Sequence, residues 1–436
     1  MTTIKNRLFR ILIFFGACSV MTAQESMIED VDFIERPPLT LLDSIKKNFI
    51  RYDKVAKIDN LWLKELASAS EISTDSTMRL DSLNLEEEVA FDLPVELLKE
   101  RLKKLDEKSP FDIEYNPALE NVIKSFLKNR KKTYERLMAL SEYYFPLFEE
   151  KLAQYHIPLE IKYLAIVESA LNPRAISRMG ASGLWQFMLP TGKAYNLSVN
   201  SYVDERYDPV KATEAACQYL SALYKMYGDW DLVLASYNAG PGNVNKAIRR
   251  SGGQTNYWNI RKNLPKETQG YLPAFLATMY IFEYHKEHNI QPQRPQIARI
   301  ETDTVMVKRQ MSFTQISELL DVTVEELKFL NPSYKLDIIP YISDKPHFLR
   351  LPIDKVGTFV ANEEVIYAYI DIENSKKEKI IPFTEEAVVT TKYHTIRRGD
   401  TLSSIAKKYG VSVNNLKKWN KISGTNIRAG QKLKVM

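Results

Sequence analysis

One glutamate, Glu168, occupies a position at which a carboxyl group could exchange a proton with a substrate. Ile161, Leu164 and Ala165 precede it at helical spacing, so we expect all four side chains on one face of a helix. A carboxyl group on an apolar face loses hydration, and this loss raises its pKa. A carboxyl group that stays protonated near neutral pH can act as a general acid. The pattern therefore predicts general acid chemistry at Glu168.

The residues after Glu168 decide between this prediction and a simpler one, in which the glutamate caps a helix end or forms a salt bridge. We expect the helix to end at Asn172, because the residue before a proline, here Pro173, disfavours the helical conformation. The turn at 180–183 contains two glycines, which would let the backbone approach a ligand closely. The run 184–188 is rich in aromatic residues and carries one amide. These features favour a binding site beside Glu168.

Two later blocks carry the same kinds of side chain. ASYNAGPG at 235–242 is expected to close another helix, and ETQGYLP at 267–273 is expected to open the next. Together the blocks offer a glutamate, amides, tyrosines and an exposed aromatic surface. A sugar polymer presents hydroxyl groups for hydrogen bonds and flat faces for stacking, so the sequence predicts a carbohydrate ligand.

The four blocks ES, GASGLWQ, SYNAGPGNV and ETQGYLP, in this order, resemble the lytic transglycosylases of glycoside hydrolase family 23. The resemblance extends from about residue 146 to residue 284 and implies a mainly α-helical, goose-type lysozyme-like catalytic domain, expected over 116–288. It also implies cleavage of the β-1,4 bond between N-acetylmuramic acid and N-acetylglucosamine in peptidoglycan. That reaction uses no water and leaves a 1,6-anhydro ring on the muramic sugar.

The resemblance implies that Glu168 acts twice, first as the acid and then as the base. Most glycosidases use two carboxylates instead. No second carboxylate is predicted, because the remaining candidates lie between the blocks: Asp204, Glu205, Asp208, Asp229 and Asp231. Two other functions compete with this one, namely a lysozyme-type muramidase that uses water and a non-catalytic wall-binding scaffold.

The resemblance also implies a set of substrate-binding residues: Ser169, Ser177, Gln186, Met188, Tyr237, Asn238 and Tyr271. Ser169 would orient the acid or cap its helix, and Ser177 would lie near the muramic sugar. Tyr271 would donate a hydrogen bond to the catalytic glutamate.

The other members of this set would line the cleft. Gln186 would meet an N-acetyl group, and the thioether of Met188 would pack on a sugar. Tyr237 and Asn238 would lie near the acid. Trp185 and its neighbours also fit plain core packing.

The C-terminal part contains an internal repeat, in which residues 312–331 align without a gap with residues 401–420. Strands at 392–396 and 432–435, with two helices between them, predict a compact βααβ unit. The second copy, at 391–436, resembles the LysM module, which binds glycans that contain N-acetylglucosamine. The first copy, at 300–352, is a degenerate LysM-like repeat.

The first copy lacks two features of the second. It has Gln310-Met311-Ser312 in place of Gly399-Asp400-Thr401, and Asp321 in place of Gly410. Glycan binding and a role as a spacer or docking module both remain open for this copy. The segment 285–296, which contains two prolines, is predicted to be a linker before it.

Residues 1–23 are predicted to be a signal peptide, because basic residues precede an apolar stretch at 11–17 that is too short to span a membrane. Either Cys18 is lipidated, which would anchor the chain to the outer membrane, or cleavage follows Ala23. Both alternatives predict export to the periplasm and cell envelope. Residues 24–110 are predicted to be an acidic region of helices and linker, of unknown role.

Composition agrees with a modular exported protein. The chain has 436 residues, of which 44% are hydrophobic and 26% are charged, so two or three domains are expected. Its formal charge of +5 comes without a basic stripe, which argues against a nucleic-acid partner. The histidines and cysteines show no metal-ligand spacing, so no cofactor is predicted.

Overall fold

The computed structural model describes residues 40–50, 63, 64, 85, 88–292, 301–376 and 393–435. The predicted signal peptide at 1–23, Cys18 and most of the 24–110 region lie outside the described residues. Helix α1 (Leu41–Lys47) belongs to a separate unit and has no buried residue. No helix in the described part of the chain has the length and apolar character needed to cross a membrane.

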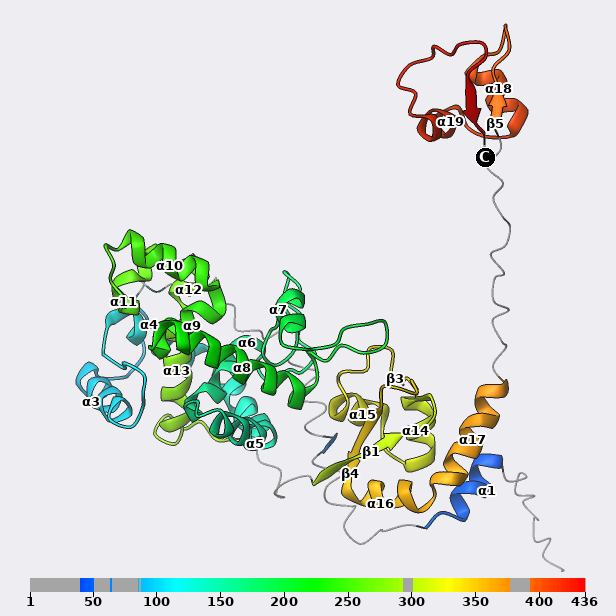
Figure 1. Cartoon of the computed structure of the whole chain (residues 1–436). Coiled ribbons are helices and arrows are strands. Elements are labelled where there is room, and N and C mark those ends of the chain that lie inside the picture. Colours follow the sequence, from blue (N-terminus) through cyan, green and yellow to red (C-terminus); the bar gives the residue numbers. More distant parts are fainter. Residues whose placement is uncertain are drawn as a thin grey trace, which may run out of the picture. The chain divides into compact units, whose positions relative to one another are not determined.

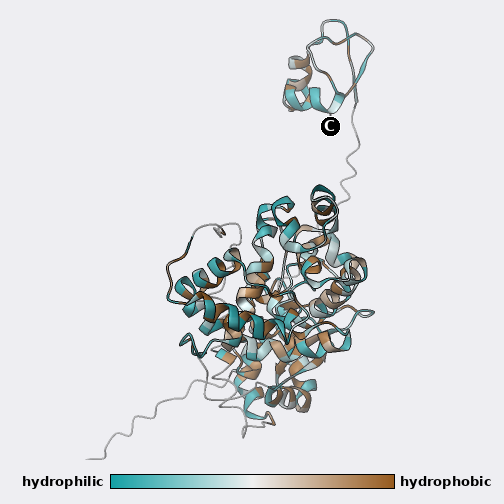
Figure 2. Cartoon of the chain, turned by 90° about the vertical axis from the view of Figure 1, so that its left-hand side faces the viewer, coloured by the Kyte–Doolittle hydropathy of each residue, from teal (hydrophilic) through white to brown (hydrophobic). Residues whose placement is uncertain are grey.

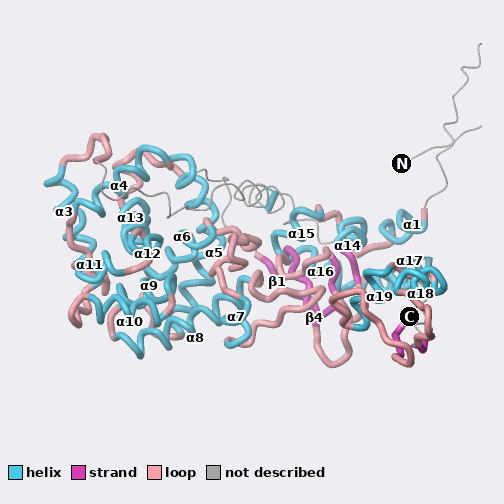
Figure 3. Tube along the Cα trace, turned by 90° about the horizontal axis from the view of Figure 1, so that it is seen from above, coloured by secondary structure: helices cyan, strands magenta, loops and turns pink. Residues whose placement is uncertain are grey.

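A mainly helical domain precedes the repeats, as predicted (Figure 1). Strands appear only after it in the described segments (Figure 3). The elements of this domain are α3 (Val95–Asp106), α4 (Pro117–Asn129), α5 (Lys131–Gln154), η2 (Leu159–Tyr163), α6 (Leu164–Ser169), α7 (Leu189–Ala194), α8 (Pro209–Tyr227), α9 (Trp230–Ala239), α10 (Pro241–Arg250), α11 (Tyr257–Ile260), η3 (Arg261–Asn263), α12 (Lys266–Gln269) and α13 (Tyr271–Glu283).

Helix α13 forms the centre of the core. Its residues from Tyr271 to Ile281 are all buried, which is expected of a helix without a polar face. It packs against α4, α6 and α9. Most surrounding helices carry both hydrophobic and hydrophilic residues, so they can face the core and the solvent at once (Figure 2).

The helix that carries Glu168 ends earlier than predicted. It stops at Ser169, because Ala170 and Leu171 both adopt left-handed backbone angles, with φ of 51° and 59°. Both side chains are fully buried, so core packing stabilises a conformation that is otherwise costly for them. Ile161 lies in the preceding 3₁₀ turn η2.

The first repeat has the predicted βααβ order, with additions. Its outer strands β1 (Thr302–Val307) and β4 (His347–Pro352) pair antiparallel around α14 (Phe313–Leu320) and α15 (Val324–Leu330). A second small sheet pairs β2 (Met311–Ser312) with β3 (Ile338–Ile339). Helices α16 (Ile353–Ala361) and α17 (Glu363–Lys376) follow.

The second repeat is the simpler of the two. Strand β5 (Tyr393–Thr395) pairs antiparallel with β6 (Lys432–Lys434) around α18 (Leu402–Tyr409) and α19 (Val413–Asn420). It has its own small core of buried aliphatic residues. Together with the helical domain, these units confirm the predicted combination of a helical domain with small α+β modules.

The aligned asparagines of the two repeats make the same contacts. Asn331 donates to the carbonyls of Leu327 and Arg350 and accepts from the N–H of Arg350. Asn420 does the same with Leu416 and Lys434. In both copies this amide joins the end of the second helix to the last strand.

The backbone turn that Gly410 forms in the second copy is retained in the first copy, although Asp321 replaces the glycine. Asp321 ends α14 with φ 55° and ψ 43°, close to the 65° and 27° of Gly410. Aspartate is one of the few residues other than glycine that adopts this conformation readily. The difference between the copies lies instead at 310–312, where Met311 and Ser312 form a strand.

The first repeat is packed on the helical domain. Phe329 and Leu330 of α15 belong to the hydrophobic core of that domain, and the Phe329 ring centroid lies 5.1 Å from that of Tyr143. The predicted linker also contributes, because Ile290 is buried in the same core. The sequence did not reveal this shared core, because the contacts join residues about 185 positions apart along the chain.

Candidate active site

Glu168 lies in the last turn of α6, where its carboxyl group meets the first residue of α13. The hydroxyl of Tyr271 donates a hydrogen bond to Oε1 of Glu168. Tyr271 is 1% exposed, and the glutamate side chain keeps a small exposed part. The packing of α6 against α13 therefore fixes the carboxyl group while leaving it accessible.

The surroundings of Glu168 hold its carboxyl group in the protonated form. Burial raises its pKa from 4.5 to about 8, and the negative charge of Glu267 adds to the shift. The hydrogen bond from Tyr271 opposes the shift, because it stabilises the carboxylate. The pKa thus changes in the direction that the sequence predicted, and the group is poised to give a proton near neutral pH.

Helix α9 brings two further predicted residues to this site. The hydroxyl of Tyr237 donates to the carbonyl of Trp185 at 2.7 Å. Burial and the charge of Glu168 raise the pKa of Tyr237, so it stays neutral. The amide of Asn238 accepts from the Thr268 hydroxyl at 2.6 Å and donates to Glu267 at 3.4 Å.

Glu267 is a residue that the sequence analysis missed. Its carboxylate influences Glu168 and is bound by Asn238, yet it is not among the five candidates for a second carboxylate. The sequence did carry one indication of its role, because it is the first residue of the ETQGYLP block. It is exposed and acts on Glu168 through charge rather than through contact.

Four of the five carboxylates that the sequence analysis set aside have structural roles. Asp204 pairs with Arg206 at 2.7 Å, and Glu205 pairs with Lys211 at 2.8 Å. Two others accept backbone hydrogen bonds at helix starts: Asp208 at α8 and Asp229 at α9. Asp231 is buried within α9, and burial raises its pKa to about 8.

The turn after Glu168 is held by the chain itself. Gly183 has φ 86°, and an added Cβ would lie 1.8 Å from the carbonyl oxygen of Arg206. The close approach that this glycine permits is therefore to the protein backbone, not to a ligand. The Arg206 guanidinium donates to the carbonyls of Gly180 and Phe187, both at 3.1 Å, and the sequence offered no sign of this role.

Two more of the predicted substrate-binding residues, Gln186 and Ser177, use polar atoms within the protein. Gln186 donates through Nε2 to the carbonyls of Gly183 and Ala175. The Ser177 hydroxyl oxygen accepts from the N–H of Ala181. These bonds brace the turn and leave the amide oxygen of Gln186 as its remaining polar atom.

Ser169 lies inside the helix end. It is fully buried, and its hydroxyl donates to the carbonyl of Ala165, so it completes the last turn of α6. The expectation that it contacts a ligand has no support from this position.

The aromatic run divides between core and surface. Trp185 is fully buried, with Nε1 donating to the Thr213 hydroxyl, and Phe187 is 2% exposed. The expected exposed aromatic surface is therefore wrong for these two residues, which form core. Met188 is 40% exposed and remains available to a ligand.

Three protein families match this chain. The Transglycosylase SLT domain matches residues 146–260, which include Glu168 and the first three blocks. The family described as Lytic transglycosylase MltD, LysM-like domain, matches residues 301–368. The LysM domain matches residues 394–435.

Several known proteins are similar over one or more of these parts. Membrane-bound lytic murein transglycosylase D of Escherichia coli K12 is 28% identical over 327 residues, which are 73% of this chain and 69% of that protein. Soluble lytic murein transglycosylase of the same strain is 31% identical over 148 residues, covering 32% of this chain and 23% of that protein. The solved 70 kDa soluble lytic transglycosylase SLT70 of Escherichia coli is 20% identical with a TM-score of 0.30, and the match covers 54% of this chain and 47% of that one.

Proposed function

The chain belongs to the SLT-type lytic transglycosylases with C-terminal LysM-type domains, and on this premise we propose that it cleaves peptidoglycan without water. The bond cleaved is the β-1,4 bond between N-acetylmuramic acid and N-acetylglucosamine. The product carries a 1,6-anhydro ring on the muramic sugar. The observation that carries this proposal is the neutral carboxyl group of Glu168, with its pKa near 8, bound by Tyr271.

Glu168 performs both proton transfers. As an acid it gives its proton to the glycosidic oxygen while the bond between that oxygen and C1 breaks. The C6 hydroxyl oxygen then bonds to C1, and its proton passes to the Glu168 carboxylate. The enzyme returns to its starting state, and no water is consumed.

Tyr271 has two tasks in this reaction. Its hydroxyl stabilises the carboxylate that exists between the two proton transfers. It also restricts the carboxyl group to one orientation, which favours reaction with a positioned sugar.

Of the predicted substrate contacts, we assign Met188, Tyr237 and Asn238 to direct sugar contact, and Gln186 and Ser177 to the shape of the turn.

The domains divide the work. Residues 116–288 carry the chemistry, and the LysM module at 391–436 holds the enzyme on the glycan of the wall. Export by the 1–23 signal peptide places it in the cell envelope, where lipidation of Cys18 would anchor it. Similarity to a transglycosylase whose name describes it as membrane-bound supports this location.

The mass of the products tests the proposal. Purified sacculi are digested with the full-length enzyme, and the released muropeptides are weighed by mass spectrometry. Products lighter by one water than those of a lysozyme-type hydrolase support it. Products of hydrolysed mass would favour the muramidase alternative, and no release would favour a wall-binding scaffold.

A further inference from the structure

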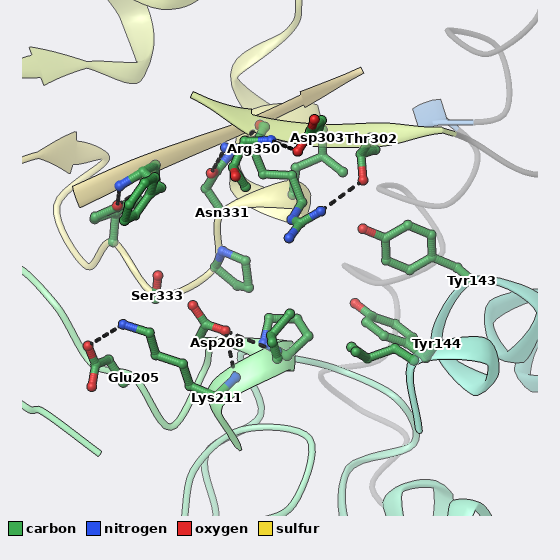
Figure 4. A pocket seen from close by; sticks show the side chains of 18 of the residues that line it. Tyr143, Tyr144, Glu205, Asp208, Lys211, Thr302, Asp303, Asn331, Ser333 and Arg350 are labelled. Atoms are coloured by element: carbon green, nitrogen blue, oxygen red, sulfur yellow. Dashed lines mark hydrogen bonds and ion pairs between the residues drawn. The ribbon is translucent and has the colours of Figure 1, made fainter. Parts of the chain in front are cut away.

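A large pocket lies where the first repeat meets the helical domain, and it has no part in the Glu168 site. Its volume is about 770 Å³, which lies within the range for small-molecule sites. Tyr143 and Tyr144 enter it from α5, Asp208 from the start of α8, and Thr302 and Arg350 from the paired strands β1 and β4 (Figure 4). The pocket is thus built jointly by the two domains.

Two buried polar atoms of the lining residues have no hydrogen-bond partner within the described part of the chain. They are the hydroxyl of Tyr144 and Nε2 of His347. Tyr144 is 1% exposed and His347 is 7% exposed, so bulk water does not satisfy them. In Figure 4 the hydroxyl end of Tyr144 points into the pocket. Buried polar groups are nearly always paired, so these two point to a polar ligand.

The charges of the lining exclude an anion. Carboxylates outnumber cations among the lining residues: Glu142, Glu205, Asp208, Glu301 and Asp303 against Lys211 and Arg350. Lys211 is already paired with Glu205 at 2.8 Å, and Arg350 donates to the Thr302 hydroxyl at 3.1 Å. Burial lowers the pKa of His347, so its imidazole is neutral. An uncharged ligand with hydroxyl donors fits this distribution best.

Aromatic rings supply the apolar part of the site. Tyr143, whose side chain is partly exposed, lies on α5 of the helical domain, and Phe348, which is 47% exposed, lies on β4. A pyranose ring can place its C–H face on such rings while its hydroxyl groups donate to carboxylates. A short sugar chain therefore matches the size, the charge and the rings of the pocket together.

We propose that this pocket is a second carbohydrate site, which holds an uncharged N-acetylhexosamine segment of the glycan strand. The identity of the sugar rests on the proposed function. The Tyr144 hydroxyl and the His347 imidazole bind the sugar, and Asp208 accepts from its hydroxyl groups. The site is distinct from the catalytic centre, since the described residues that line it include neither Glu168 nor Tyr271.

The pocket is connected to the catalytic turn. Arg174, six positions after Glu168, donates to the carbonyls of Pro332 and Tyr334 at 3.2 and 2.9 Å. These two residues flank Ser333, which lines the pocket. A sugar held between the two domains therefore stabilises their interface. Arg174 connects that interface to the segment that follows Glu168.

Photo-crosslinking locates the site in the full-length chain. The Glu168→Gln variant, which we expect not to turn over, is mixed with a tetramer of N-acetylglucosamine that carries a diazirine, irradiated and digested for peptide mass spectrometry. We expect labelled peptides that contain 142–147 or 346–350, in addition to labels at the catalytic turn and in 393–435. Labels confined to the catalytic turn and to 393–435 would overturn the proposal.

Two substitutions test the assignment of the contacts. Tyr144→Phe removes only the unpartnered hydroxyl, so we expect labelling of the pocket to fall about 3-fold to 10-fold, as for the loss of one hydrogen bond. Thr304→Trp adds bulk from an exposed position in the lining and should abolish labelling there, whereas Thr304→Ser should not. Tyr224→Phe, on the far part of α8 outside this pocket, is the matched tyrosine control. Unchanged pocket labelling in both Tyr144→Phe and Thr304→Trp would overturn the proposal.

These experiments test the second carbohydrate site separately from the proposed transglycosylase activity. Anhydro products from the wild-type enzyme without pocket labelling would overturn only this inference. Labelling by a peptide-bearing fragment but not by the sugar tetramer would also overturn it, because the occupant would then be the peptide.

Discussion

The Tyr271 hydroxyl donates to Oε1 of Glu168, although the two residues lie 103 positions apart in the chain. The bond joins the end of α6 to the start of α13, the most buried helix of the domain. The proton donor of the proposed reaction is therefore held by the core itself. Its protonation depends on a balance between burial, which raises the pKa, and this bond, which lowers it.

Tyr271→Phe should shift this balance. Without the donated bond the pKa of Glu168 rises further, so the alkaline limb of the rate profile should move to higher pH. The rate should also fall roughly 10-fold to 100-fold, because a hydrogen bond to a charged group is worth about 1.5–3 kcal/mol. The rate of muropeptide release between pH 5 and 10 measures both effects. Tyr224→Phe is the control, and coincident alkaline limbs for Tyr271→Phe and wild type would contradict the assignment.

Glu267→Gln should act in the opposite direction. Removing the negative charge favours ionisation of Glu168, so its pKa falls and the alkaline limb moves to lower pH. The side chain is exposed, so the shift should be well under one pH unit at physiological salt. Low ionic strength should enlarge the effect. Glu114→Gln changes an exposed carboxylate for which no role is assigned, and a shift of equal size there would refute a specific role for Glu267.

The raised pKa of Glu168 should lower the free energy of unfolding at neutral pH. Its pKa is raised in the folded state, so the unfolded chain loses this proton first, and stability falls as pH rises from about 4.5 to about 8. Glu168→Gln removes this penalty and should become more stable than wild type over that range. The gain is at most about 5 kcal/mol at 1.36 kcal/mol per pKa unit, and it is smaller because the group is partly exposed. Urea unfolding at pH 5 and pH 8 measures it, and a difference between the two proteins that does not grow with pH would contradict the raised pKa.

The two LysM-type modules should respond differently to truncation. Ending the chain after Lys376 removes residues 377–436, including the second LysM module with its own core, and should leave the melting temperature of the remainder unchanged. Ending it after Gln291 also removes Phe329 and Leu330, which belong to the catalytic core, and should destabilise that domain. Circular dichroism melts of both truncated forms test this. Equal melting temperatures would show that the helical domain is independent, as the predicted linker implied.

Phe329→Ala tests the shared core without truncation. Large-to-small substitution of a buried phenylalanine costs about 3–5 kcal/mol, so the helical domain should lose stability although the residue lies in the repeat. Val360→Ala, at a position that is 61% exposed, is the control. If Phe329→Ala unfolds the repeat at low urea while the helical domain unfolds as in wild type, the two do not share a core.

The sequence predicted those features that depend on local pattern. The apolar face before Glu168, the helical end at 235–242 and the paired repeats all follow from spacing along the chain. The matching hydrogen bonds of Asn331 and Asn420 agree with the alignment of the two repeats. The sequence could not predict that the side chain of Gln186 points into the protein. Its amide donates hydrogen bonds to backbone carbonyls that are brought close only by the fold of the turn. The sequence also could not predict the hydrogen bonds of Arg206 to the turn or the packing of the first repeat on the helical domain. Both depend on contacts between distant segments of the chain.

Digestion of sacculi in ¹⁸O-labelled water tests the central claim most directly. If Glu168 transfers the proton in both directions and the C6 hydroxyl attacks C1, the wild-type products carry the anhydro ring and no ¹⁸O at the muramic sugar. Glu168→Gln, which cannot give or take the proton, should release neither form, with a loss of about 10⁴-fold or more. Incorporation of ¹⁸O at C1 by the wild-type enzyme, or anhydro products from Glu168→Gln at the wild-type rate, would contradict the account.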